Sequence, residues 1–125
     1  MISHVSFGTN DVKRAKEFYS PIFEKLGLKL MKENERALDY GVGDFLFSLE
    51  TPSNGQKASA GNGTHICLRA SSRKQVDEFH RIALANGGTS NGEPGIRGEY
   101  DPHYYSAFVL DPDGNKLELV TFAAH

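Results

Sequence analysis

The sequence repeats itself at a fixed spacing, and this internal repeat limits the possible folds more than any other feature. Adding 61 to a residue number in the first half reaches a residue of similar character in the second half. The matched pairs are His4 and His65, Val5 and Ile66, Phe7 and Leu68, Lys13 and Lys74, Phe18 and Phe79, Phe23 and Leu84, and Gly27 and Gly88. A repeat of this kind indicates two copies of one supersecondary unit that bury apolar surface together.

The apolar pattern of the first unit predicts a strand, a helix and three further strands. The expected strands cover residues 2–8, 28–32, 36–40 and 45–50. Between the first two, apolar side chains recur at helical spacing, with Asn10 or Asp11 as the N-cap and Gly27 as the stop signal. Pro21 lies inside this helix, so we expect a kink or a break near residues 17–20.

The second unit shows the same order of elements after a polar linker at residues 51–62. Residues 72–75 form a capping box, and the helix that follows carries its apolar stripe at Val76, Phe79, Ala83 and Leu84. Strands are expected over residues 89–96, 104–110 and 116–121, with a turn at 111–114. The chain is therefore predicted to be one α+β domain of two βαβββ units, residues 1–50 and 63–125, with mixed sheets that curve around a cleft.

Strand alternation selects four polar side chains that share one kind of surface. If Val5, Ile66 and Leu117 face the helices, the alternation turns His4, His65 and Glu118 to the opposite faces of the sheets. Ser48 has the same phase and stands at the repeat position of Glu118, at an offset of 70. If the sheets wrap around a cleft, these four side chains converge there.

Two imidazoles and one carboxylate from separate strands are a ligand set for a divalent transition metal. A single histidine in a strand is more often a packed residue, but two at equivalent repeat positions are hard to explain by packing. Glu118 is an acid within an otherwise apolar strand, and such an acid needs a partner. We therefore predict that His4, His65 and Glu118 bind one ion. The set accepts Zn, Mn, Ni, Co or Fe, so the sequence does not name the metal.

Composition excludes several other classes of protein. The chain has 125 residues and a net charge of −2, with no basic cluster for binding a nucleic acid backbone. No apolar stretch approaches the roughly 20 residues of a membrane helix. The first ten residues do not resemble a signal peptide, and a single cysteine cannot form an intramolecular disulfide. We expect a soluble, cytoplasmic protein that binds neither nucleic acid nor membrane.

The sequence resembles the vicinal oxygen chelate superfamily over essentially its whole length. This superfamily includes glyoxalase I, fosfomycin-resistance thiol transferases, extradiol dioxygenases and bleomycin-resistance proteins. The resemblance is carried by the segments ISHV at residues 2–5, AKEFY at 15–19, LGL at 26–28, GTHI at 63–66 and DPDGNKLE at 111–118. It implies metal ligands at His4, His65 and Glu118, with Glu118 also the catalytic carboxylate.

Ser48 separates the subfamilies. The resemblance implies that glyoxalase I would have a fourth ligand, normally Glu, where this sequence has Ser48. Thiol transferases and dioxygenases of the superfamily use two His and one Glu, which matches this sequence better. Bleomycin-resistance proteins lack the metal ligands, so the presence of all three counts against that class.

The segment from Gly95 to Tyr105 is expected to line the cleft beside the strand of Glu118. The predicted substrate-binding residues are Ser48, Arg97, Tyr100, Tyr104, Ser106 and Phe108. Arg97 could hold a carboxylate or phosphonate with both guanidinium nitrogens, or be a solvated loop residue. Cys67 is a possible soft ligand or reactive thiol, although a small buried packing role is favoured.

These features favour a metal-dependent enzyme that acts on a small oxygen-rich substrate, with the metal as a Lewis acid in lyase, isomerase or thiol-transfer chemistry. The alternatives are a small-molecule sequestering protein and an Fe(II) extradiol dioxygenase. A single βαβββ unit leaves one sheet face open, and two units can pair within one chain or between two. We therefore expect a two-fold homodimer, with the form in which units are exchanged between chains somewhat favoured.

Overall fold

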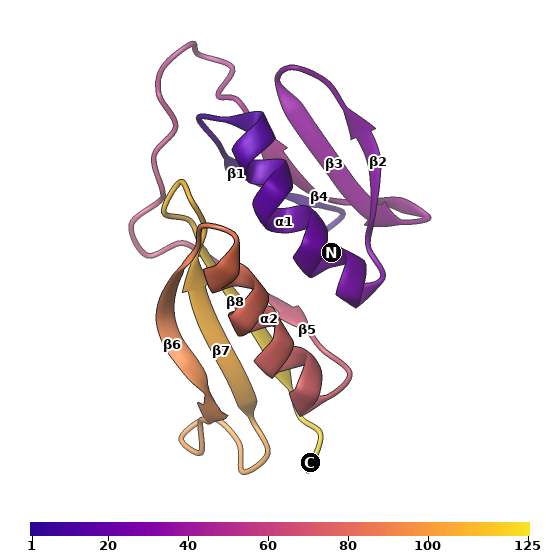
Figure 1. Cartoon of the computed structure of the whole chain (residues 1–125), viewed down its shortest axis with the longest axis vertical. Coiled ribbons are helices and arrows are strands. Elements are labelled where there is room, and N and C mark those ends of the chain that lie inside the picture. The colour runs from indigo at the N-terminus through magenta and orange to yellow at the C-terminus, as the bar shows by residue number, and fades with distance from the viewer.

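A computed structural model describes residues 1–125 and contains two βαβββ units (Figure 1). The first comprises β1 (Val5–Gly8), α1 (Val12–Leu26), β2 (Lys29–Glu33), β3 (Ala37–Val42) and β4 (Asp44–Glu50). The second comprises β5 (His65–Arg69), α2 (Arg73–Ala85), β6 (Thr89–Ile96), β7 (Tyr105–Leu110) and β8 (Lys116–Thr121). The predicted α+β fold with two repeated units is confirmed.

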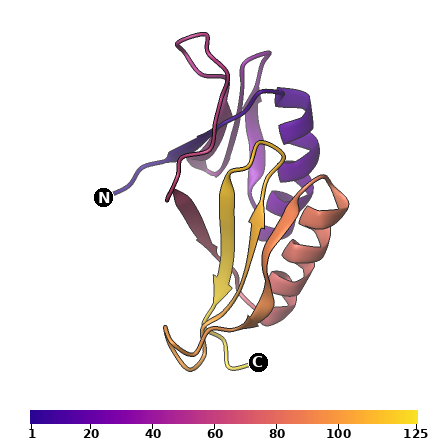
Figure 2. The ribbon, with the colours of Figure 1, turned by 90° about the vertical axis from the view of Figure 1, so that its left-hand side faces the viewer.

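Each unit forms its own mixed sheet. The strand orders are β1-β4-β3-β2 and β5-β8-β7-β6, and in both sheets the first strand is parallel to its neighbour. Both helices lie on the same side of the molecule, so each sheet has one face without a helix (Figure 2). The sheets share no hydrogen-bonded pair of strands. The two sheets therefore do not close into one continuous sheet within the chain.

Helix α1 runs without interruption through Pro21, so the predicted break is wrong. Asp11 is the N-cap and accepts a hydrogen bond from the Arg14 N–H, and Gly27 ends the helix at φ 83°. The proline removes one N–H donor, but the apolar face of the helix is fully buried, including Phe18 and Tyr19 at 0% exposure. Helices in proteins owe most of their stability to such packing, which here outweighs the lost hydrogen bond.

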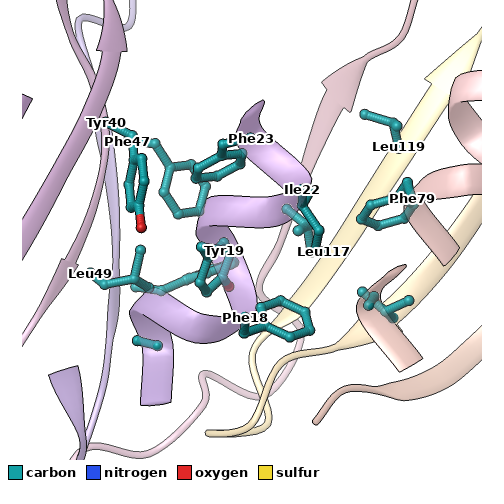
Figure 3. Close-up of a cluster of buried hydrophobic side chains, with 14 of the residues drawn as sticks. Phe18, Tyr19, Ile22, Phe23, Tyr40, Phe47, Leu49, Phe79, Leu117 and Leu119 are labelled. Carbon is teal, nitrogen blue, oxygen red and sulfur yellow. The ribbon is translucent and has the colours of Figure 1, made fainter. Parts of the chain in front are cut away.

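One continuous core joins the two units. In Figure 3, α1 lies between the first sheet and the second unit. Tyr40 and Phe47 of the first sheet are on one side of this helix, and on the other side Ile22 of α1 lies beside Leu117 of β8. The helix thus buries two sides. Leu84, predicted for the buried stripe of α2, is 42% exposed, and Ile82 packs against the core instead.

A polar cluster also connects the units, and we call it the clasp. It consists of the turn residues Asp111, Asp113 and Asn115 and of Gly8, Thr9, Asn10, Arg14 and Tyr19. The Tyr19 hydroxyl donates to Asp111 Oδ2 at 2.6 Å, and Asn115 donates to the Gly8 carbonyl at 2.9 Å. Asp111 also accepts from Asn115 Nδ2 and from the backbone N–H groups of Asp113 and Asn115. Its buried carboxylate is thus supplied with four donors.

The hydrogen bond between Tyr19 and Asp111 is expected to stabilise the fold measurably. Burial raises the pKa of both groups, so Tyr19 remains protonated and donates. Tyr19→Phe should lower the free energy of unfolding by about 2 kcal/mol, because a buried carboxylate loses a donor. Tyr40→Phe is the matched control, since its hydroxyl bonds only to the neutral Ser20. Equal losses in urea unfolding of the two variants would contradict a special role for the clasp.

Candidate functional site

The open face of the second sheet brings together His65, Tyr104 and Glu118. The strand register aligns Glu118 of β8 with Cys67 of β5 and Phe108 of β7. Leu117 and Leu119 are buried in the core, and strand alternation therefore turns Glu118 to the face without a helix. His65 Nε2 lies 3.0 Å from Glu118 Oε1, and the Tyr104 hydroxyl donates to Glu118 Oε2 at 2.6 Å.

The carboxylate of Glu118 is buried without an arginine or lysine partner. The residue is 2% exposed, and its only ionic contact is with His65. Burial and the neighbouring Glu118 raise the pKa of Tyr104, so its hydroxyl stays protonated and donates to the carboxylate. Partial desolvation of its sulfur inside the cavity, followed by the charge of Glu118, likewise raises the pKa of the Cys67 thiol to about 12. In this arrangement Cys67 is therefore not a thiolate at neutral pH.

A cavity of about 510 Å³ opens in front of Glu118. Its walls are His65, Cys67, Tyr100, Tyr104, Phe108, Lys116 and Glu118. Ser106 stands between Tyr104 and Phe108 on the site face of β7, and its fully buried hydroxyl has no hydrogen-bond partner. The guanidinium of Arg97 lies over the Phe108 ring at 5.7 Å and donates to the Glu93 carbonyl. Of the predicted substrate-binding residues, Tyr100, Tyr104 and Phe108 line the cavity with His65 and Glu118, whereas Arg97 contacts Phe108 and Ser106 is buried, and neither of these two is a wall residue.

His4 and Ser48 belong to the first unit instead: Ser48 is in β4, and His4 directly precedes β1, which begins at Val5 and not at the predicted residue 2. His4 is exposed, and its ring packs against Phe45 at 4.3 Å between centroids. Ser48 is buried and donates to Asp39 Oδ1 at 3.0 Å. Within one chain, no three His, Cys, Asp or Glu side chains come together as a set that could hold a metal ion. The four side chains selected by strand alternation are therefore divided between two units.

Two cavity residues differ from the sequence-based expectation. Cys67 was expected to fill a small buried space, but it is exposed and lines the cavity. Its position two residues from His65 in the same strand already indicated this face. Lys116 was not predicted as a site residue, although it lies two residues before Glu118 and the same rule would have found it.

Comparison with known proteins identifies the family. The model of the Glyoxalase/Bleomycin resistance protein/Dioxygenase superfamily matches residues 1–119, and the chain belongs to this superfamily. A crystal structure of a glyoxalase/bleomycin resistance protein from Albidiferax ferrireducens superposes with a TM-score of 0.90 at 38% identity, covering 97% of this chain and 98% of that one.

Two curated relatives carry names that specify an activity. A lactoylglutathione lyase of Arabidopsis thaliana is 30% identical over 94% of this chain and 42% of its own length. A metallothiol transferase of Shouchella clausii is 26% identical over 96% of this chain and 79% of its own length. This chain thus spans less than half of the plant enzyme. Neither of its own helices has the length and hydropathy needed to cross a membrane.

Proposed function

We propose that this protein is a divalent-metal-dependent enzyme that acts on an oxygen-rich small molecule. The observation that carries the proposal is the buried Glu118 carboxylate, which faces a cavity and contacts His65 at 3.0 Å without any lysine or arginine partner. Imidazole nitrogen and carboxylate oxygen are the donor types that zinc, manganese, iron, cobalt and nickel accept. The names of the metallothiol transferase and the lactoylglutathione lyase support this class of activity.

His65 and Glu118 supply two donors, and we assign His4 as the third. A bound ion would act as a Lewis acid on substrate oxygens. Glu118 would hold it as a ligand and serve as the catalytic carboxylate.

We infer that two chains complete each site. His4 directly precedes β1 of the first unit, the pair His65 and Glu118 lies on the second sheet, and the two sheets do not pair within the chain. Each sheet also has a face without a helix, which a second copy can cover (Figure 2). In an exchanged homodimer, the first unit of one chain would bring His4 to the second unit of its partner. This arrangement follows two-fold symmetry and gives two equivalent sites.

The environment of Ser48 favours chemistry with two His and one Glu over a four-ligand site. Its hydroxyl is already engaged with the Asp39 carboxylate on the adjacent strand. A neutral hydroxyl is a poorer ligand for a divalent ion than a carboxylate. Thiol transfer, as in the name of the Shouchella clausii relative, therefore fits this site better than a glyoxalase I reaction.

Metal content tests the proposed function. Protein purified without added metal is expected to retain close to one divalent ion per chain and to recover it after treatment with a chelator. Elemental analysis by mass spectrometry measures both quantities. A chain that neither carries nor takes up stoichiometric metal, yet still binds small molecules, would support the sequestering alternative. Iron binding under anaerobic conditions, followed by oxygen uptake with a catechol, would support the dioxygenase alternative.

Tyr104 is expected to tune metal affinity through Glu118. Its hydroxyl fixes one carboxylate oxygen at 2.6 Å, and removing such a supporting hydrogen bond typically weakens metal binding by about 10-fold to 100-fold. Tyr104→Phe should therefore raise the metal dissociation constant in this range without changing the circular dichroism spectrum. The neighbouring Tyr105→Phe is the matched control, because that hydroxyl donates to Asp77 on α2, also at 2.6 Å. Equal metal affinities of the two variants would contradict the role of Tyr104.

A further inference from the structure

We propose that the cavity in front of Glu118 recognises a small molecule that combines an anionic group with an apolar body, and that Lys116 is the principal residue for the anion. This inference rests on the proposed function in one respect: it names the substrate class of the same site. The evidence is the position of two cations on one aromatic ring, the absence of carboxylate partners for both, and the composition of the cavity walls.

The Phe108 ring is contacted by two positive charges. Lys116 Nζ lies 5.0 Å and the Arg97 guanidinium carbon 5.7 Å from its centroid. Both side chains are partly buried, so their stems pack on the protein, and of the two Lys116 lines the cavity. Like charges close to one ring repel each other, and an anion bound beside Lys116 would reduce this repulsion.

Neither cation is neutralised by the protein itself. Ion pairs with carboxylates are formed by Arg14 with Asp113 and by Lys16 with Glu33, but by neither Lys116 nor Arg97. The hydrogen bond that Arg97 donates goes to a backbone carbonyl and leaves its charge uncompensated. The nearby acid, Glu118, is engaged by His65 and Tyr104. Lys116 therefore brings a positive charge without a carboxylate partner to the cavity wall.

The cavity walls indicate the shape of the ligand. Tyr100, Tyr104 and Phe108 form an aromatic wall, with the Tyr100 and Tyr104 rings 5.0 Å apart. Lys116 and His65 also border a second cavity of about 310 Å³, lined by residues 61–64 and Gly114. Lys116 thus stands where the two spaces meet. A ligand could place its apolar body against the aromatic wall and its anionic group at this junction, which matches the usual mixture of apolar walls and few polar groups in ligand sites.

Paired fluorescent probes test the assignment on the full-length protein. Anilinonaphthalene sulfonate carries an aromatic body and an anion, whereas phenylnaphthylamine has a similar body without the sulfonate. Lys116→Met removes the charge but keeps a flexible apolar stem against Phe108. We expect this variant to weaken binding of the anionic probe by about tenfold, the loss of one charge-assisted contact, and to leave the neutral probe unchanged. Lys116→Arg should retain most of the affinity for the anionic probe.

Lys74→Met is the matched control, because Lys74 is an exposed cation on α2, away from the cavity. It should bind both probes as the parent protein does. Equal loss of both probes in Lys116→Met, or equal loss of the anionic probe in Lys74→Met, would overturn the assignment.

The same titrations are carried out on metal-free and metal-loaded protein, with metal content measured in parallel. Loss of the anionic probe in Lys116→Met together with an absence of metal binding in the parent would refute the proposed enzyme but support the anion site. Normal metal binding in the parent, together with unchanged binding of the anionic probe in Lys116→Met, would support the proposed enzyme but refute the anion site.

Discussion

Replacing Glu118 with alanine is expected to abolish metal binding while the fold remains intact. The carboxylate is one of three proposed protein donors, and its loss should raise the metal dissociation constant by more than about a hundredfold, beyond the effect of a supporting residue. The fold should survive because Glu118 points away from the helices, whereas its neighbours Leu117 and Leu119 make the core contacts. Competition with a chromophoric chelator measures the affinity, and circular dichroism measures the fold.

Glu50→Ala provides the matched control for this experiment. Glu50 is the acid at the end of β4, the strand of the first sheet that corresponds to β8, but it is exposed. Its replacement should leave metal content unchanged. If Glu118→Ala protein retains the metal content of the parent, Glu118 is not a ligand and the proposed site is wrong.

Mixing two inactive variants is expected to restore metal binding. In an exchanged homodimer, His4→Ala and Glu118→Ala chains together form one site with all its ligands and one with two missing. Random mixing after denaturation and refolding makes half of the dimers mixed, and half of their sites are complete. Recovery should therefore reach about a quarter of the parental metal binding. The reason is the separation of His4 from His65 and Glu118 into different units of the same chain.

The control mixture combines His65→Ala with Glu118→Ala. Both of these ligands belong to one unit of one chain, where they are in contact. An exchanged dimer of these variants has no complete site, so no recovery is expected. Absence of recovery in the first mixture as well, with dimers verified by light scattering, would place each site within a single chain.

Local periodicity was sufficient to predict the elements and the phase of most strands. The spans of β6 and β8 agree with the predicted residues 89–96 and 116–121, and Ser72 caps α2 as expected. Alternation also placed Glu118 on the face opposite the core, because Leu117 and Leu119 must both be buried. These features depend on neighbouring residues, so the sequence alone carries them.

Features that depend on distant contacts were not predictable in this way. Helix α1 continues through Pro21 because it packs against the first sheet and against the second unit. Leu84 is exposed because no other element covers its side of α2. The same holds for the spacing of Lys116 and Arg97 around Phe108, since they come from different strands and a loop.

The sequence by itself determined that the chain contains two βαβββ units, each with a histidine at or next to the start of its first strand, because strand and helix periods and the repeat are local properties. Only the tertiary structure decided how the units sit together. They are held by a shared core and by clasp contacts such as that of Tyr19 with Asp111, 92 residues apart. Such contacts set how the two units lie against each other, and no periodicity encodes them, because they depend on how two already formed surfaces fit together.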